Sequence, residues 1–220
     1  MGYTHYMKFS YTFMCILCLC LVFVSSNVHA HPVTFKGGTA ITVKSLPNNV
    51  TTEVNHSFNP NVAASGVFIN RKSATKTLSG FTMGVNLLLK RWNGTHSQAN
   101  VYALGSMGIK TSEPAGGLLS IGGLQLDFET LRFYTATSSR MIWAGQDKWV
   151  DTTVRIGFAP YEADYTSLQS WIVAQVMYMH TPDGDRVIPS MLMRFFYRTV
   201  LWELGADLYG RPWIQLMAHY

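Results

Sequence analysis

Apolar and polar residues alternate along most of this chain with a period of two, the pattern of a β-strand that buries one face and solvates the other. In "GLQLDFE", Leu124, Leu126 and Phe128 share one face, and Gln125 and Asp127 share the other. The pattern predicts about twelve strands, at residues 38–46, 50–58, 62–71, 78–92, 97–111, 118–129, 131–144, 148–161, 167–180, 186–198, 200–209 and 212–220.

Turn-forming residues separate these segments. The breaks read "LPNN", "NPN", "KSAT", "NGTHS", "SEPAGG", "GQD", "YEADYT", "PDGD" and "YGRP". Pro, Gly, Asn and Asp each favour turn dihedrals. The boundary near Thr130 lacks a strong break, so it is the least certain of the set.

Strand length and aromatic placement favour a membrane barrel. Many segments reach the nine to eleven residues that a tilted strand needs to cross a bilayer. Aromatic residues gather near strand ends, where an interfacial girdle would lie: Trp92, Trp143, Trp149, Tyr161, Tyr178, Tyr197, Tyr209, Trp213 and Tyr220. We therefore expect residues 31–220 to form an all-β fold, a transmembrane antiparallel up-and-down β-barrel. A soluble periplasmic β-sandwich, which also alternates, is the alternative fold.

The first 30 residues differ from the rest. An apolar run follows Lys8, and Val28 and Ala30 fit the small-residue pattern of a signal-peptidase site before His31. We expect a cleaved signal peptide over residues 1–30; a retained anchor is the alternative. All three cysteines of the chain lie within this segment, so the exported chain has no disulfide framework.

Composition narrows the environment further. Charged residues make up only 13% of the chain, about half the share usual in soluble domains. Lys and Arg form no cluster of the kind that follows phosphates, which argues against a nucleic-acid partner. Together with the export signal, these features predict a location in the bacterial outer membrane, with membrane lipid as the partner of the apolar face.

If the apolar faces meet lipid, the polar faces enclose a lumen, because a charge near the bilayer midplane costs roughly 2–4 kcal/mol. The predicted inward charges are nearly balanced in sign, which favours a cross-linked interior over a wide ion-selective pore. The expected lumen charge network comprises Lys44, Glu53, Lys90, Lys110, Asp127, Glu129, Arg140, Asp151, Arg155, Arg194, Arg198, Glu203 and Asp207. The chain is then a narrow channel or a structural barrel.

The sequence leaves two other functions to consider: a lipid-modifying enzyme and a copper-binding protein. A lipid-modifying enzyme, an acyl hydrolase or acyltransferase, needs Ser, His and a carboxylate together, and only "THS" places His96 beside Ser97. Neighbouring strand residues point to opposite faces, so this adjacency is a weak signal, and we assign no catalytic residue. Copper is the only cofactor that the sequence suggests, because thioethers and imidazoles suit copper(I). The candidate ligands are His31, Met177, Met179 and His180.

The last strand, "PWIQLMAHY", resembles the C-terminal strands of bacterial outer-membrane β-barrels as a class. In that class the barrel-assembly machinery recognises a terminal aromatic residue preceded by alternate apolar residues. The matching positions here are Ile214, Leu216, Ala218 and Tyr220. The resemblance implies insertion by that machinery.

Shorter blocks resemble a proteobacterial envelope family that has no established activity. They are "HPVTFKGG", "GLQLDFETLRFYT" and "VRIGFAPYEADY" followed by "RFF". This second resemblance implies a link to copper and other metal tolerance.

Overall fold

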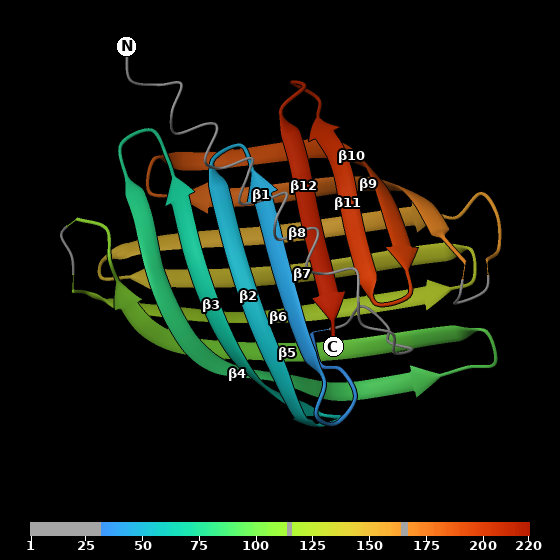
Figure 1. Ribbon diagram of the computed structural model, residues 1–220. Coiled ribbons are helices and arrows are strands. Elements are labelled where there is room, and N and C mark those ends of the chain that lie inside the picture. The colour runs from blue at the N-terminus through green and yellow to red at the C-terminus, as the bar shows by residue number, and fades with distance from the viewer. Residues whose placement is uncertain (1–31, 114–115, 164–166) are drawn as a thin grey trace, which may run out of the picture.

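The chain forms one closed β-barrel of twelve antiparallel strands (Figure 1). The computed structural model describes residues 32–113, 116–163 and 167–220. The strands are β1 (Thr39–Leu46), β2 (Asn49–Asn59), β3 (Val62–Lys72), β4 (Thr77–Asn93), β5 (Ser97–Lys110), β6 (Leu118–Thr130), β7 (Phe133–Ala144), β8 (Asp147–Phe158), β9 (Gln169–Thr181), β10 (Gly184–Tyr197), β11 (Val200–Asp207) and β12 (Pro212–His219).

Two sequence expectations fall outside the described residues: the signal peptide over residues 1–30 and the metal-ligand candidate His31. In the part of the chain that the structure covers, no helix has both the length and the apolar character needed to cross a membrane.

Each strand pairs with its neighbours in sequence, and β1 pairs with β12 to close the sheet. The register at closure aligns Ile41 with Ala218 and Lys44 with Gln215. Just beyond these strands, Thr39 and Tyr220 exchange two backbone hydrogen bonds of 2.9 Å. The predicted barrel and its strand number are therefore confirmed, and the β-sandwich alternative is wrong because the sheet has no open edge.

The outer face of the barrel is an apolar belt. Exposed large apolar side chains lie on almost every strand, and several are more than half exposed: Met83, Leu89, Met107, Ile109, Leu118, Leu124, Phe133, Ile156, Val187 and Met191. Several of them alternate with buried residues, as with Thr82 (0% exposed) beside Met83 (68% exposed). An apolar surface of this extent needs an apolar partner.

The two walls of the barrel cross at a steep angle. In Figure 1, β12, β1, β2 and β3 run along the near wall, and β5 to β9 run across them behind. Inward-facing glycines permit close approach where the sheet curves. A Cβ atom on Gly84 would collide with the Gly105 carbonyl oxygen and with Ser106 Cα on β5. A Cβ atom on Gly108 would collide with Phe81 and Thr82 on β4.

A β-bulge in β4 changes which side chains face inward. The pairing with β5 shifts between Leu88 and Lys90, so one extra residue enters β4. Lys90 then opposes the outward Val101, while Arg91 opposes the buried Asn100. The prediction that Lys90 faces the lumen is therefore wrong, because strict alternation does not survive an inserted residue. Lys90 is exposed on the outer face, with its ammonium 5.9 Å from the ring centroid of Trp92.

The segment that precedes β1 folds into the barrel end where β1 begins and the chain ends at Tyr220, which we call the proximal end. Val33 is 1% exposed and packs against the inward residues Ala63, Leu88 and Tyr102. The Thr34 N–H donates to Ser57 Oγ at 2.9 Å. Residues 32–38 therefore close part of the proximal end. The opposite end, with turns such as β1–β2 and β9–β10, is the distal end.

The weakly marked boundary near Thr130 is a two-residue turn. Thr130 Oγ1 accepts hydrogen bonds from the backbone N–H groups of Arg132 (3.2 Å) and Phe133 (2.9 Å). A hydroxyl can replace the turn signal that Gly or Pro gives elsewhere.

We predict that Gly84→Ala lowers the free energy of unfolding by about 1–3 kcal/mol, because the added methyl group displaces the backbone of β5. The measurement is urea unfolding in detergent micelles, followed by tryptophan fluorescence. Gly105→Ala is the matched control, since a Cβ atom there meets nothing within 4 Å. Equal effects of the two substitutions would show that the close approach of β4 and β5 is not a constraint.

Candidate functional site: the barrel lumen

The lumen holds three cavities in series. The first, which we call the vestibule, has a volume of about 500 Å³ and opens at the proximal end. The second, the central cavity, has a volume of about 190 Å³. The third, the distal cavity, has a volume of about 50 Å³. Glu129 and Arg194 line both the vestibule and the central cavity, and Asn49 lines both the central and the distal cavity.

Two ion pairs span the lumen from opposite walls. Arg140 on β7 binds Glu53 on β2, with Nη2 and Oε2 2.8 Å apart, although four strands separate them on the shorter path around the sheet. Arg71 on β3 binds Asp151 on β8 at 2.5 Å, again with four strands between. We call these two pairs the crossbars. Because they join facing walls, they divide the lumen and brace it against widening.

A third charged group centres on Glu203 of β11, which is fully buried. Arg155 Nη1 donates to both of its carboxylate oxygens at 3.0 Å, and Arg194 Nε lies 3.1 Å from Oε1. The Arg194 guanidinium also lies over the ring of Tyr134, 4.3 Å from its centroid. A buried carboxylate with two arginine partners avoids the cost of an isolated charge.

Side-chain amides complete the polar interior. Asn55 and Asn86 each donate to Glu53 Oε1 at 3.1 Å. Asn100 donates to Asp127 at 2.6 Å, and its own oxygen accepts from Arg91 at 2.8 Å. These amides satisfy carboxylate lone pairs that no cation reaches, as buried polar groups require.

Of the thirteen residues predicted for the lumen charge network, most face the lumen. Eight line the central cavity: Lys44, Glu53, Asp127, Glu129, Arg140, Asp151, Arg155 and Arg194. Glu203 binds two of these arginines. Lys110 ends β5 and opposes the inward Gly80 at the distal rim.

Two predicted network members do not face the lumen. Lys90 faces outward because of the β4 bulge. Arg198 is exposed in the β10–β11 turn with φ of 53°, because β10 ends at Tyr197, one residue before the predicted limit. Asp207 faces inward, as predicted, and lines the distal cavity, where it binds Arg211 at 2.6 Å and caps the β11–β12 turn.

Sequence reasoning missed two inward arginines. Arg71, 1% exposed, forms a crossbar and lies over the Trp149 ring, 5.3 Å from its centroid. Arg71 is the last residue of the predicted strand 62–71, and the sequence prediction assigned it neither to the lipid face nor to the lumen face. Arg91 reaches Asn100 only because of the bulge. The segment "VFINRK" carries no signal for Arg71, since the apolar Val67 and Ile69 share its parity and would suggest a lipid-facing position.

Apolar side chains fill much of the distal half of the lumen. One cluster packs Leu78, Leu119, Ile142 and Trp149 from four strands. A second runs along the barrel, from Tyr134 and Trp171 near the proximal end to Leu46 and Trp213 near the distal end. These clusters leave the distal cavity as a narrow space.

Hairpin turns meet across the distal end. In the β3–β4 turn, Thr75 donates its backbone N–H to Asp183 of the β9–β10 turn at 3.0 Å, and its hydroxyl also donates to this carboxylate. Lys76 binds Asp147 at the start of β8. Hydrogen bonds from Ser73 and then Thr75 lower the pKa of Asp183 to about 2. We call the Thr75–Asp183 contact the distal latch.

Of the copper-ligand candidates that the structure describes, Met177 and Met179 face inward and His180 faces outward. Met177 is buried in the second apolar cluster, and Met179 packs against it from the same inward face. His180 lies on the outer face, where Nδ1 is 2.6 Å from Asp185 Oδ1. Among the residues that the structure describes, His, Cys, Asp and Glu form no group of three or more suited to a metal ion.

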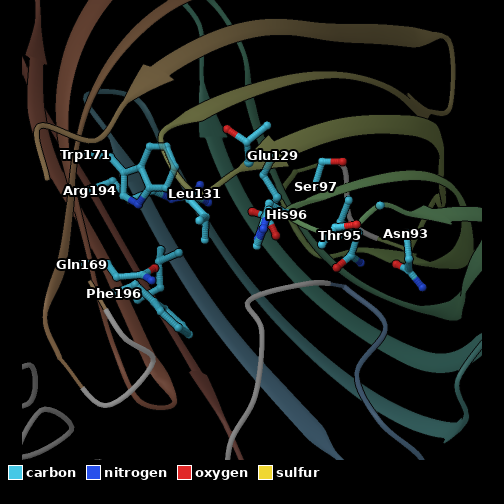
Figure 2. A pocket seen from close by; sticks show the side chains of 14 residues that line it. Asn93, Thr95, His96, Ser97, Glu129, Leu131, Gln169, Trp171, Arg194 and Phe196 are labelled. Atoms are coloured by element: carbon cyan, nitrogen blue, oxygen red, sulfur yellow. The ribbon is translucent and has the colours of Figure 1, made fainter. Parts of the chain in front are cut away.

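The enzyme candidates His96 and Ser97 both line the vestibule, together with Glu129 (Figure 2). His96 lies in the β4–β5 turn and Ser97 begins β5. In residues 32–113, 116–163 and 167–220, no hydrogen bond joins His96 to Ser97. The hydrogen-bonded Ser–His pair of acyl-transfer enzymes is therefore not assembled in this structure.

The predicted assembly-signal residues occupy the closing strand. Ile214 opposes Ser45 and Leu204, and Leu216 opposes Val43 and Trp202, all on the outer face. Ala218 is 2% exposed. Tyr220 continues the pairing with Thr39.

We predict that Arg140→Met lowers the free energy of unfolding by about 3 kcal/mol, because it leaves Glu53 without its cation inside the barrel. The double variant Glu53→Gln/Arg140→Met should lose clearly less, since no buried charge then remains unpaired. Urea unfolding in micelles measures both. If the double variant loses as much as Arg140→Met or more, the crossbar is not a coupled pair.

We also predict an acid dependence of the distal latch. The folded-state pKa of Asp183, about 2, lies below its ordinary value of 3.8. The latch therefore stabilises the fold above about pH 4, and this contribution disappears as the pH falls toward 2. The melting temperature of Asp183→Asn should fall less than that of the wild type between pH 5 and pH 2. Glu162→Gln, at an exposed carboxylate of the proximal β8–β9 loop, is the control and should follow the wild type.

Comparison with solved structures places the fold among known barrels. A KdgM porin, solved in complex with disordered oligogalacturonate, aligns with a TM-score of 0.52 at 11% identity over 83% of this chain and 98% of its own. A bacterial polysaccharide outer membrane secretin aligns with a TM-score of 0.36 at 6% identity, over 83% of this chain and 97% of its own. No protein-family model matches the chain, and no curated protein matches its sequence. The likeness to the KdgM porin shows a shared barrel fold.

Proposed function

We propose that this chain is an integral protein of the bacterial outer membrane that conducts small hydrophilic solutes along a narrow, braced lumen. The apolar belt and the closed sheet support the membrane location. Only helices and closed barrels satisfy their backbone hydrogen bonds within hydrocarbon. The charges at the middle of the barrel all face inward, where lipid does not meet them.

The series of three cavities is the observation that carries the channel proposal. Neighbouring cavities share the wall residues Glu129, Arg194 and Asn49, so the three cavities lie next to one another between the proximal and the distal end. In the proposed path, the crossbars limit the width in the middle, and the apolar clusters and the distal latch limit it at the distal end. A sealed structural barrel needs no such row of cavities.

The volumes set the size of the solute. A central cavity of 190 Å³ holds about six water molecules at roughly 30 Å³ each. Inorganic ions and small organic molecules fit this space in partly hydrated form. Larger solutes require the crossbars to separate.

Delivery to the membrane follows the sequence expectations. A cleaved signal peptide over residues 1–30 exports the chain, and the closing strand β12 presents Ile214, Leu216, Ala218 and Tyr220 to the barrel-assembly machinery. Pairing of β12 with β1 supports this order, because β12 must be in place before the sheet closes. Copper tolerance is not part of the proposal, since the three candidate ligands on β9 do not share a face: Met177 and Met179 face inward, and His180 faces outward.

Recording in planar lipid bilayers tests the channel. We predict small unitary currents for the wild-type barrel and at least a twofold larger unitary conductance for Glu53→Ser/Arg140→Ser, because the variant removes one crossbar from the middle of the path. His180→Ser/Asp185→Ser is the matched control. It removes a His–carboxylate pair from the outer face and should leave the conductance unchanged.

Two results would contradict the proposal. One is the absence of current from both the wild type and the crossbar variant, each shown to be folded and inserted. The other is an equal increase in the control variant, which would place the conducting path outside the lumen.

A further inference from the structure

We infer that the central cavity contains a binding site for a small monovalent anion, with Lys44 as its principal recognition residue. Binding depends on the arrangement of donors in the cavity. The consequence for ion selectivity rests on the proposed channel function.

The carboxylates near Lys44 are already occupied. Glu53 accepts from Arg140, Asn55 and Asn86. Asp151 accepts from Arg71, and Glu203 binds both Arg155 and Arg194. Each of these acids has its own donors, so none is left over for a further cation.

Lys44 is the unpaired cation of the central cavity. Its ammonium lies over the Trp213 ring, 4.5 Å from the centroid. The cavity is lined by the cations Lys44, Arg140, Arg155 and Arg194 and the carboxylates Glu53, Asp127, Glu129 and Asp151. Arg140, Arg155 and Arg194 each bind a carboxylate, whereas within the described residues no carboxylate lies within ion-pair distance of Lys44. Lys44 is therefore the lining cation that has no direct counterion.

A second cation strengthens the positive potential at this point. The Arg155 guanidinium lies 5.5 Å from the centroid of the same Trp213 ring, so the two positive charges are no more than about 10 Å apart. Like charges held this close inside a barrel favour an anion between them.

Two unused hydrogen-bond donors lie beside Arg155 and Lys44. Gln175 gives its amide oxygen to Arg155 at 2.7 Å, and its buried Nε2 has no partner. The buried indole N–H of Trp213 has none either. Gln175 and Trp213 are each 2% exposed. Within the part of the chain that the structure covers, no carboxylate oxygen is among the buried polar atoms without a partner.

An ammonium without a counterion and unpaired N–H donors fit one class of ligand: a small anion that accepts several hydrogen bonds, such as formate or chloride. The single unpaired ammonium matches a monovalent ion. The 190 Å³ volume favours small anions over bulky organic ones, because the ion shares the space with water.

Thermal unfolding in non-ionic detergent tests binding without any need for conduction. Sodium formate replaces sodium gluconate, whose anion is too bulky for the cavity, at a constant ionic strength of about 0.3 M. We expect formate to raise the melting temperature of the wild type by about 2–4 °C, because it binds the folded state alone. Lys44→Met should lose this shift, and Lys44→Arg should keep most of it.

Lys148→Met is the control, because Lys148 is exposed on the outer face at the start of β8. It should retain the full shift. An equal shift in wild type and Lys44→Met would mean a general salt effect and would overturn the site. The absence of any shift in the wild type would also overturn it.

Reversal potentials in a KCl gradient separate this inference from the channel proposal. We expect the wild type to prefer chloride, Lys44→Met to lose most of that preference, and Lys44→Glu to prefer potassium. If the barrel passes no current but the formate shift depends on Lys44, conduction fails and the site stands. If current flows and neither selectivity nor the formate shift depends on Lys44, the site fails and conduction stands.

Discussion

Closure of the sheet between β1 and β12 is the constraint on which the rest of this structure depends. A strand edge left open in a membrane exposes backbone N–H and C=O groups to hydrocarbon, at several kcal/mol for each group. The register of β1 with β12 removes that edge. It also fixes the parity of both strands, so that Lys44 and Gln215 face the lumen together and Ile41 and Ala218 face outward. Closure of the sheet creates a lumen, so a charged side chain in the middle of a strand can point away from the lipid.

The enclosed side determines the energetics of the interior. Charges in a narrow lumen lose much of their hydration, so they remain only where partners replace it. The crossbars Arg140–Glu53 and Arg71–Asp151 replace the lost hydration with ion pairs that span the barrel. Glu203 is compensated by two arginines. The same contacts restrict the bore. Bracing and permeation therefore depend on the same side chains, and a narrow path is the expected result.

Strand number, strand limits and most inward charges could be predicted from alternation and turn residues alone. Asp127, Arg155 and Glu203 face inward because nothing disturbs the period of two in β6, β8 and β11. Lys90 could not be placed correctly, since a bulge depends on how β4 pairs with β5 and leaves no clear mark in the local sequence. Arg198 was misplaced because "YRTV" lacks Gly and Pro, although it forms a turn.

The partners of the inward charges were also beyond the sequence. Glu53 and Arg140 are 87 residues apart, and their contact follows from the steep crossing of the two walls. The distal latch has the same origin, because Thr75 and Asp183 belong to turns 108 residues apart. Alternation gives the face of a residue, and only the closed three-dimensional sheet gives its neighbour across the lumen.

The central claim is that apolar side chains face lipid and charged side chains face an enclosed aqueous lumen. Site-directed spin labelling tests this most directly, because the only cysteines are Cys15, Cys18 and Cys20, all in the predicted signal peptide. Single cysteines placed in turn at residues 150–157 of β8 would carry a nitroxide in liposomes. The account predicts that labels at Val154 and Ile156 are relaxed mainly by oxygen dissolved in lipid, and labels at Thr153 and Arg155 mainly by a water-soluble nickel chelate. Uniform accessibility along β8, or the opposite alternation, would contradict it.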